Sequence, residues 1–137
     1  MAEDKLLDVE IVTPNKTIYS GRIQSITLPG SKAPFQVLFN HAPIVSSLEI
    51  GSIKLVDENG KDIYFASTDG FTEVSRNVVS VMVESAEEAS QINVGDVSTA
   101  LNELKEKLNN APIDEVKRVK KLIEINENKL KIAKKNK

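Results

Sequence analysis

The sequence predicts a β + α protein, with an N-terminal antiparallel β-sandwich or flattened barrel over residues 1–86 and a C-terminal antiparallel two-helix hairpin over residues 87–137. Two observations predict this order. As far as Ser85, apolar and polar residues alternate in short runs bounded by turn residues, a pattern typical of sandwiches and barrels. After Ser85, β-branched residues give way to Ala, Glu, Leu and Lys at helical spacing.

Three runs of alternating residues predict the first half of the sandwich. The first run ends at a break over residues 13–16, which contains a proline. In the second run, Ser25 and Thr27 are expected to point away from the face that their apolar neighbours share. The residues expected to share one face of their run are Leu7, Val9 and Ile11, then Gln24, Ile26 and Leu28, then Phe35, Val37 and Phe39.

Two hairpins are predicted in the second half of the sandwich. The clearer one covers residues 52–66, because Asn59 and Gly60 readily adopt the positive φ angles of a tight turn. The other covers residues 71–83 and turns at residues 75–77. Its second strand is rich in valine, whose branched side chain favours strands.

Two helices with a short connection are predicted for the rest of the chain. The first is capped by Asn93 or Asp96 and stops at Asn109 and Asn110, and Pro112 is tolerated in the first turn of the second. The short connection favours an antiparallel hairpin that buries its apolar stripes against each other or against the sheet. The stripes are Val97, Leu101, Leu104 and Leu108, and Val116, Val119, Ile123 and Leu130. Because both are narrow, we expect the hairpin to dock by only a few kcal/mol and to be able to detach.

Composition and charge exclude several classes of protein. The chain has no Cys and one His, which excludes disulfide scaffolds and thiolate nucleophiles and leaves few ways to bind a metal. Residues 1–111 carry 9 Lys and Arg against 16 Asp and Glu, whereas residues 112–137 carry 9 against 4. The net charge of -2 gives no reason to expect nucleic acid as a partner. The basic helix either binds an acidic protein surface or is simply solvated.

The sequence carries no recognisable catalytic motif. Gly30-Ser31-Lys32 lacks the spacing of a phosphate-binding P-loop, and the acidic pairs are adjacent residues that do not face one another. His41 has no accompanying nucleophile motif. We interpret His41 as a structural residue in a corner that Pro43 holds extended, and we predict no catalytic residue, metal or cofactor.

Six short motifs and the helical pair support a more specific hypothesis. The motifs are residues 7–14, Tyr19-Ser20-Gly21, Leu28-Pro29-Gly30, Asn40-His41-Ala42-Pro43-Ile44, Ile50-Gly51 and residues 69–74. In this order, and over nearly the whole chain, they resemble the epsilon subunit of F-type ATP synthases. The resemblance implies a non-catalytic rotor subunit of the central stalk, which links the gamma subunit to the c-subunit ring and couples ion translocation to ATP synthesis.

The resemblance also implies which residues contact the partners. The interface with gamma and the c ring corresponds to Gly30, Ser31, Lys32, His41, Ala42 and Pro43. In the family, the helical pair alternates between a compact state and an extended state that reaches the alpha and beta subunits and inhibits ATP hydrolysis. The basic residues that would meet the beta subunits are Lys117, Arg118, Lys120, Lys121, Lys129 and Lys131. We predict that replacing the first four of these by Ala relieves inhibition.

The sequence departs from the family at two places. Some bacterial members bind ATP through a motif that opens the first helix, and the matching positions here include Asp96 and Thr99. Because Thr99 replaces the arginine of that motif, we expect weak ATP binding or none. The loop after Pro29-Gly30 also lacks the additional glycines of many members. The resemblance implies a peripheral subunit, held at the cytoplasmic face of a bacterial membrane, or at a plastid thylakoid, only through its complex.

Other classes of function remain open at this stage. The main rival is an unrelated sandwich that binds a partner and dimerises through Val116, Val119 and Ile123. An enzyme is the third alternative. The rival predicts self-association of the isolated chain, whereas the rotor hypothesis predicts a monomer that pairs with gamma, so sedimentation would separate the two.

Overall fold

The computed structural model of the chain describes residues 5–136. Its strands and helices lie close to the positions that the sequence predicts. Helices α1 (Val94–Asn110) and α2 (Ile113–Ala133) follow the strands, and short 3₁₀ turns lie at η1 (Ala89–Gln91) and η2 (Lys134–Asn136). The strands are β1 (Leu7–Val12), β2 (Thr17–Leu28), β3 (Phe35–Val37), β4 (Ile44–Leu48), β5 (Gly51–Asp57), β6 (Asp62–Ser67), β7 (Gly70–Ser75), β8 (Val78–Val83) and β9 (Ala86–Glu88).

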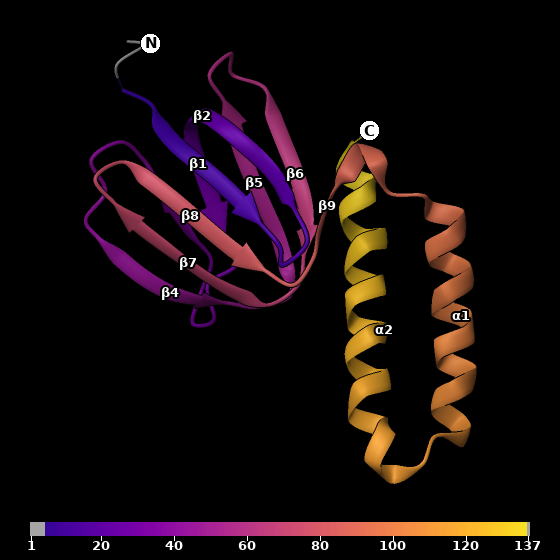
Figure 1. Cartoon of the computed structure of the whole chain (residues 1–137). Helices are drawn as coiled ribbons and strands as arrows, with labels where there is room; N and C mark the ends of the chain where they lie inside the picture. Colours follow the sequence, from indigo (N-terminus) through magenta and orange to yellow (C-terminus); the bar gives the residue numbers. More distant parts are fainter. Residues whose placement is uncertain (1–4, 137) are drawn as a thin grey trace.

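The strands form one continuous sheet that folds over into a sandwich. Its order is β4-β7-β8-β1-β2-β5-β6-β9, and β3 pairs with β2 outside this path. In Figure 1, β4, β7 and β8 lie on one side of the sandwich and β5 and β6 on the other. Neighbouring strands are antiparallel, apart from the parallel pair of β1 and β8. The predicted sandwich is therefore confirmed, and it is not a closed barrel.

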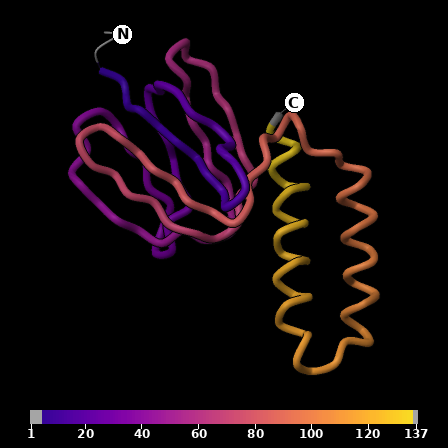
Figure 2. The backbone as a smooth tube through the Cα atoms, viewed as in Figure 1, coloured from indigo at the N-terminus to yellow at the C-terminus, as the bar shows by residue number. Residues whose placement is uncertain are grey.

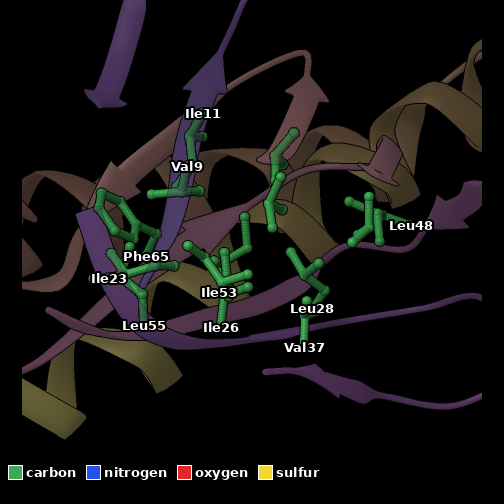
Figure 3. Close-up of a cluster of buried hydrophobic side chains, with 14 of the residues drawn as sticks. Val9, Ile11, Ile23, Ile26, Leu28, Val37, Leu48, Ile53, Leu55 and Phe65 are labelled. Atoms are coloured by element: carbon green, nitrogen blue, oxygen red, sulfur yellow. The ribbon is translucent and has the colours of Figure 1, made fainter. Parts of the chain in front are cut away.

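The inward-facing residues of the sandwich form its main hydrophobic core. Strands β1 to β8 all contribute, and Figure 3 shows the side chains converging between the two layers. Burying each large aliphatic side chain contributes about 1.5–3 kcal/mol relative to leaving it exposed. The most completely buried large residues are Phe65, Leu7, Ile11, Ile23, Ile26, Leu28, Ile53 and Leu55.

Two details of the predicted alternation are wrong. In β2, a register shift between Ile23 and Ser25 adds one residue, so Ile23 and Ile26 are both fully buried and Gln24 is not. Ser25, which was expected to point away from the apolar face, is also buried. Such a bulge moves the following side chains to the opposite face. Strand β3 ends at Val37, and Phe39 lies in a turn, because the chain bends at Asn40, whose φ is 67°.

The hairpin turns follow the prediction only in part. Ser75 and Val78 pair directly, and Arg76 and Asn77 between them have φ values of 51° and 65°, so this turn has the two positive φ angles of a tight hairpin. In the β5–β6 turn, Gly60 has a positive φ of 85° but Asn59 does not have a positive φ, so the predicted Asn-Gly turn is only partly correct. Strand β9, which pairs with β6, was missed because its three residues are too few to show an alternation.

The two helices form the predicted antiparallel hairpin. The side chain of Asn93 caps α1 by accepting a hydrogen bond from the Asp96 N–H at 3.0 Å, so Asn93 is the N-cap. Figures 1 and 2 show the hairpin beside the sandwich, with α2 between α1 and the sheet. A second buried cluster joins the two parts, and its members are Ala66, Ala89, Ile92, Val97, Ile132 and Ala133. Of the predicted stripes, Val97, Leu101 and Val119 are buried and the other members are half-buried. The α2 residues buried in the cluster with Ala66 are Ile132 and Ala133, which the predicted stripe did not include.

Candidate functional site

The loop between β2 and β3 is fastened to the end of β4. Gly30 forms a β-bridge with Leu48, and the Ser31 N–H donates to the Ser47 carbonyl at 3.1 Å. The hydroxyl groups of the same two serines lie 2.8 Å apart. A Cβ at Gly30 would lie 2.6 Å from the Ala33 carbonyl oxygen, so the loop requires glycine there. Gly30 is buried and shapes the loop, which leaves Ser31 and Lys32 as the exposed residues of the predicted interface.

The corner before β4 holds the other half of the predicted interface. The backbone N–H of His41 donates to the Leu38 carbonyl at 3.0 Å, and its Nδ1 lies 2.7 Å from the Ala42 carbonyl oxygen. Because a carbonyl only accepts hydrogen bonds, Nδ1 carries the proton in this contact. His41 is half-buried, and Ala42 and Pro43 are exposed. These contacts fit the structural interpretation of His41.

A pair of asparagines fixes this corner to the β7–β8 turn. The Asn40 N–H donates to Asn77 Oδ1 at 2.6 Å, and Asn77 Nδ2 donates back to Asn40 Oδ1 at 3.3 Å. The corner and the β2–β3 loop flank opposite ends of β4, Ile44–Leu48. A strand of this length separates its ends by about 17 Å. The six predicted interface residues therefore lie in two separate loops.

A third exposed surface was missed from the sequence. On the outer side of β4, β7 and β8, Val45 is 72% exposed and Phe71 is 54% exposed. Phe71 pairs across the sheet with Met82, and both line an open cavity of about 500 Å³ next to Pro14. We define the outer apolar face as Val45, Phe71, Val78 and Met82. Its signal in the sequence is clearest in β8, where Val78 and Met82 alternate with buried valines, whereas in β7 Phe71 shares the exposed phase with Glu73 and Ser75. Exposed apolar surfaces are typical of interaction sites.

The basic residues of α2 serve different roles. Lys121 Nζ lies 3.1 Å from Asp69 Oδ1, and its hydrogen bond goes to Oδ2 at 3.3 Å. Asp69 Oδ1 is buried and accepts no hydrogen bond, so the positive charge of Lys121 compensates the cost of burying this oxygen. Lys129 pairs with Glu87 at 3.6 Å, and Asn128 Nδ2 donates to the Gly51 carbonyl at 2.9 Å. Two of the six predicted basic residues therefore hold α2 on the sandwich.

The other four basic residues do not pair with the sandwich. Arg118 pairs with Glu115 of its own helix at 3.5 Å. Lys117 and Lys120 are exposed and form no ion pair with any residue in the described range 5–136. Lys131 is exposed and lines a cavity between α2 and the sandwich. In this docked state, Lys117, Lys120 and Lys131 are the predicted basic residues that are exposed and form no ion pair within the described residues.

The residues at the degenerate ATP motif lie in the first two turns of α1. Asp96 lies in the first turn of α1, where its N–H is capped by Asn93. The Thr99 hydroxyl donates to the Gly95 carbonyl at 3.1 Å. Both residues are exposed. The expectation of weak or absent ATP binding stays a prediction.

The structure offers little for acid–base or metal chemistry in its described part. Within residues 5–136, no three His, Asp or Glu side chains gather to hold a metal ion. Burial raises the pKa of Tyr19, with smaller contributions from Asp57, Glu58 and Glu88. Its ring packs edge-on against Phe65 at 5.9 Å, which is a structural contact. Neither helix in the described range combines the length and apolar character that crossing a bilayer requires.

Comparisons with known proteins agree on one family. Residues 6–89 match the family model described as "ATP synthase, Delta/Epsilon chain, beta-sandwich domain". The ATP synthase epsilon chain of Pelotomaculum thermopropionicum is 37% identical over 105 residues, which cover 77% of this chain and 78% of the relative. The epsilon chain of Nitratidesulfovibrio vulgaris strain DP4 is 38% identical, and the match covers 79% of this chain and 85% of the relative. That of Staphylococcus saprophyticus is 32% identical, covering 93% and 96%.

Solved structures share the fold at lower sequence identity. A chain in the OSCP/F1/c-ring structure of the Euglena gracilis mitochondrial ATP synthase has a TM-score of 0.78 and 21% identity, covering 90% of this chain and 79% of that one. A chain in the central stalk and c-ring structure of the Tetrahymena thermophila enzyme has a TM-score of 0.51 and 20% identity, covering 62% and 68%. The first match includes the helical hairpin as well as the sandwich, since the sandwich alone is too short for such coverage.

Proposed function

Because the chain belongs to the epsilon chains of ATP synthases, we propose that it is a non-catalytic subunit of the central stalk that links the gamma subunit to the ring of c subunits. In this role it couples ion translocation to ATP synthesis by joining two rotating parts. The outer apolar face carries the proposal, because it is an exposed apolar surface on a rigid sheet. A continuous sheet with a dense core is suited to transmit torque without deforming.

We assign the outer apolar face and the adjoining corner at His41, Ala42 and Pro43 to gamma. Aromatic residues in the centre of an interface commonly supply much of its binding energy, and Phe71 has the exposure and position to do so. The β2–β3 loop, with Ser31 and Lys32 exposed, is assigned to the c ring. Its fastening to β4 means that a contact made there is passed directly to the sheet that bears Phe71.

Co-elution with gamma on size exclusion tests the assignment. The chain should form a stable one-to-one complex at low and at moderate salt. Phe71→Asp should weaken the affinity about 30-fold, as expected for a central aromatic contact. Ile113→Asp is the matched control, because Ile113 is 93% exposed at the start of α2 and far along the chain from the outer apolar face. Equal binding by both variants would remove the outer apolar face from the interface.

The helical hairpin is assigned a regulatory role in the same complex. The proposal is that it docks on the sandwich in one state and, in another, extends to the alpha and beta subunits and inhibits ATP hydrolysis. The division of the basic residues supports this role, since Lys121 and Lys129 serve docking while Lys117 and Lys120 stay available. The complex would hold the chain as a peripheral subunit at the cytoplasmic face of a bacterial membrane.

The rival dimerisation hypothesis has less support in the structure. It requires the stripe of Val116, Val119 and Ile123 to be free. Val119 is completely buried, and the other two are half-buried within the hairpin and its contacts. A dimer through this stripe would first have to open the hairpin.

A further inference from the structure

One carboxylate lies among the side chains of the outer apolar face. The side chains of directly paired strand residues lie on the same face of a sheet, as do those of alternate residues in one strand. Glu73 of β7 pairs with Val45 of β4, and Phe71 precedes Glu73 by two residues. All three side chains are exposed. The negative charge of Glu73 is therefore embedded in the most exposed apolar part of the sheet.

A second carboxylate continues the same row of paired residues. Ser80 of β8 pairs with Glu73 on one side and with Glu10 of β1 on the other. The row crosses neighbouring strands in the order β4, β7, β8 and β1, which follow one another across one layer of the sandwich in Figure 1. Because one strand separates them, Glu10 and Glu73 lie about 10 Å apart.

The described part of the chain supplies no cation to either carboxylate. Within residues 5–136, neither Glu10 nor Glu73 forms an ion pair. Asp8 is the other exposed acidic residue of β1 on this face, and it has a partner, because Arg22 lies 3.9 Å away. Arg76, in the β7–β8 turn, also forms no ion pair in this range. The face is therefore both apolar and negatively charged.

Covering this face changes the environment of its carboxylates. While the face is exposed, water and salt stabilise the charge of Glu73. A purely apolar partner would bury that charge without compensation, which is strongly unfavourable. Arginine is the most suitable counterpart, because its planar guanidinium binds a carboxylate through two parallel hydrogen bonds and stacks on aromatic rings. Phe71, two residues from Glu73 on the same face, offers such a ring.

We propose that the surface of gamma that covers the outer apolar face carries an arginine or lysine that pairs with Glu73, and a second basic residue near Glu10. This inference rests on the proposed function, in which gamma occupies the face. The apolar residues supply contact area, whereas the carboxylates select a cationic partner and fix its orientation. Attraction between the acidic face and a basic surface also speeds association at low salt.

Substitutions of Glu73 test the proposal through the Kd of the full chain for gamma. Glu73→Gln keeps the shape of the side chain and removes its charge, so it should raise the Kd about ten-fold. Glu73→Leu should weaken binding at least as much, because the cation of gamma would then be buried against an apolar side chain. Glu103→Gln is the matched control, because it removes one charge at an exposed position of α1 and should leave the Kd within about two-fold. Tighter binding by Glu73→Leu would overturn the proposal, since it would mean that an uncharged surface covers this position.

Salt dependence and the position of Glu10 sharpen the test. Glu10→Gln should raise the Kd about three-fold at about 50 mM salt, and by less at about 300 mM, because salt screens exposed charges. An unchanged Kd for Glu73→Gln, with Phe71→Asp still weakened, would overturn this inference and leave gamma on the face. Failure of the wild-type chain to bind gamma would overturn both. A salt-dependent dimer of the isolated chain that Glu73→Gln abolishes would overturn it in favour of a second copy that supplies its own α2 lysines.

Discussion

The sandwich and the hairpin differ in where their apolar residues are buried. The sandwich closes its core within itself, since all strands from β1 to β8 contribute to one cluster. The hairpin depends on its neighbour, because the buried end of α2, at Ile132 and Ala133, packs on Ala66 of β6 and on η1. Other links to the sandwich are two partly exposed ion pairs, the Asn128 hydrogen bond and the cation–π contact of Lys135 with Tyr64. The contrast indicates a body that keeps its shape and an arm whose docking is adjustable.

Alternation within β6 lets one strand serve both parts. Phe65 points into the sandwich core, whereas Tyr64 and Ala66 belong to the cluster that contacts the helices. Helix α2 docks on the outward-facing residues of β6, and the inward-facing residues of the same strand stay in the sandwich core. Undocking would therefore expose Tyr64 and Ala66 without opening the sandwich.

The largest effect is expected from a cavity in the sandwich core. Phe65→Ala should lower the free energy of unfolding of the sandwich by about 3–5 kcal/mol, because the Phe65 side chain is almost completely buried. Leu104→Ala, at a half-buried position in α1, should cost about 1 kcal/mol. Urea unfolding followed by circular dichroism measures both. Similar losses in the two variants would break the comparison, since they would mean that the hairpin is as much a part of the core as Phe65.

The second effect concerns the sandwich without its arm. A chain ending at Asn93 should keep the sheet and lose about 2–3 kcal/mol of unfolding free energy, because only the outer cluster around Ala66 and Ala89 loses its cover. Amide NMR should show the core resonances of β1, β2 and β8 near their positions in the full chain. Collapse of the resonance dispersion would show that the sandwich needs the helices to fold.

The sequence predicted the two-part architecture because apolar residues recur at every second position in the sandwich and at helical spacing in the hairpin. It predicted a cap at Asn93 or Asp96, of which the structure has Asn93, and a helix end at Asn109 and Asn110, because these residue types favour helix ends. The bulge in β2 was missed, although Gln24 and Ser25 between Ile23 and Ile26 interrupt the alternation. Such an interruption does not distinguish a bulge within one strand from the end of a strand. The alternating pattern also could not show that Gly30 is buried, or that the β2–β3 loop and the corner at His41 flank opposite ends of β4. Both depend on contacts between residues far apart in the sequence.

The roles of the basic residues also lay beyond the sequence. Lys121 and Lys117 look alike in a list of helix residues, yet only the fold brings Asp69 to Lys121, fifty-two positions earlier in the chain. The outer apolar face was detectable in principle from β8, because Val78 and Met82 make its second phase largely apolar, whereas Phe71 shares its phase of β7 with Glu73. Such a pattern is also typical of strands buried on both faces, so exposure had to come from the structure.

The third effect tests the adjustable docking directly. The double variant Lys121→Ala and Lys129→Ala should weaken docking by about 1 kcal/mol, since both ion pairs are partly exposed to solvent. Hydrogen exchange should accelerate about five-fold at the α2 amides and stay unchanged in β8. The control is Lys117→Ala with Lys120→Ala, which removes the same charge without touching the sandwich. Faster exchange in the control as well would attribute the effect to charge alone.

The smallest effect, and the most informative about regulation, is a difference between two double variants in the inhibition of ATP hydrolysis by the assembled complex. Lys117→Ala with Lys120→Ala should relieve inhibition about two- to three-fold, because these exposed cations are free to attract acidic segments of the beta subunits. Lys121→Ala with Lys129→Ala should change inhibition less or increase it, because losing the contacts to Asp69 and Glu87 favours the undocked state. Replacing Lys117, Arg118, Lys120 and Lys121 together mixes the two effects, so the separate pairs are the sharper test. Equal relief in both double variants would mean that docking on the sandwich does not compete with inhibition.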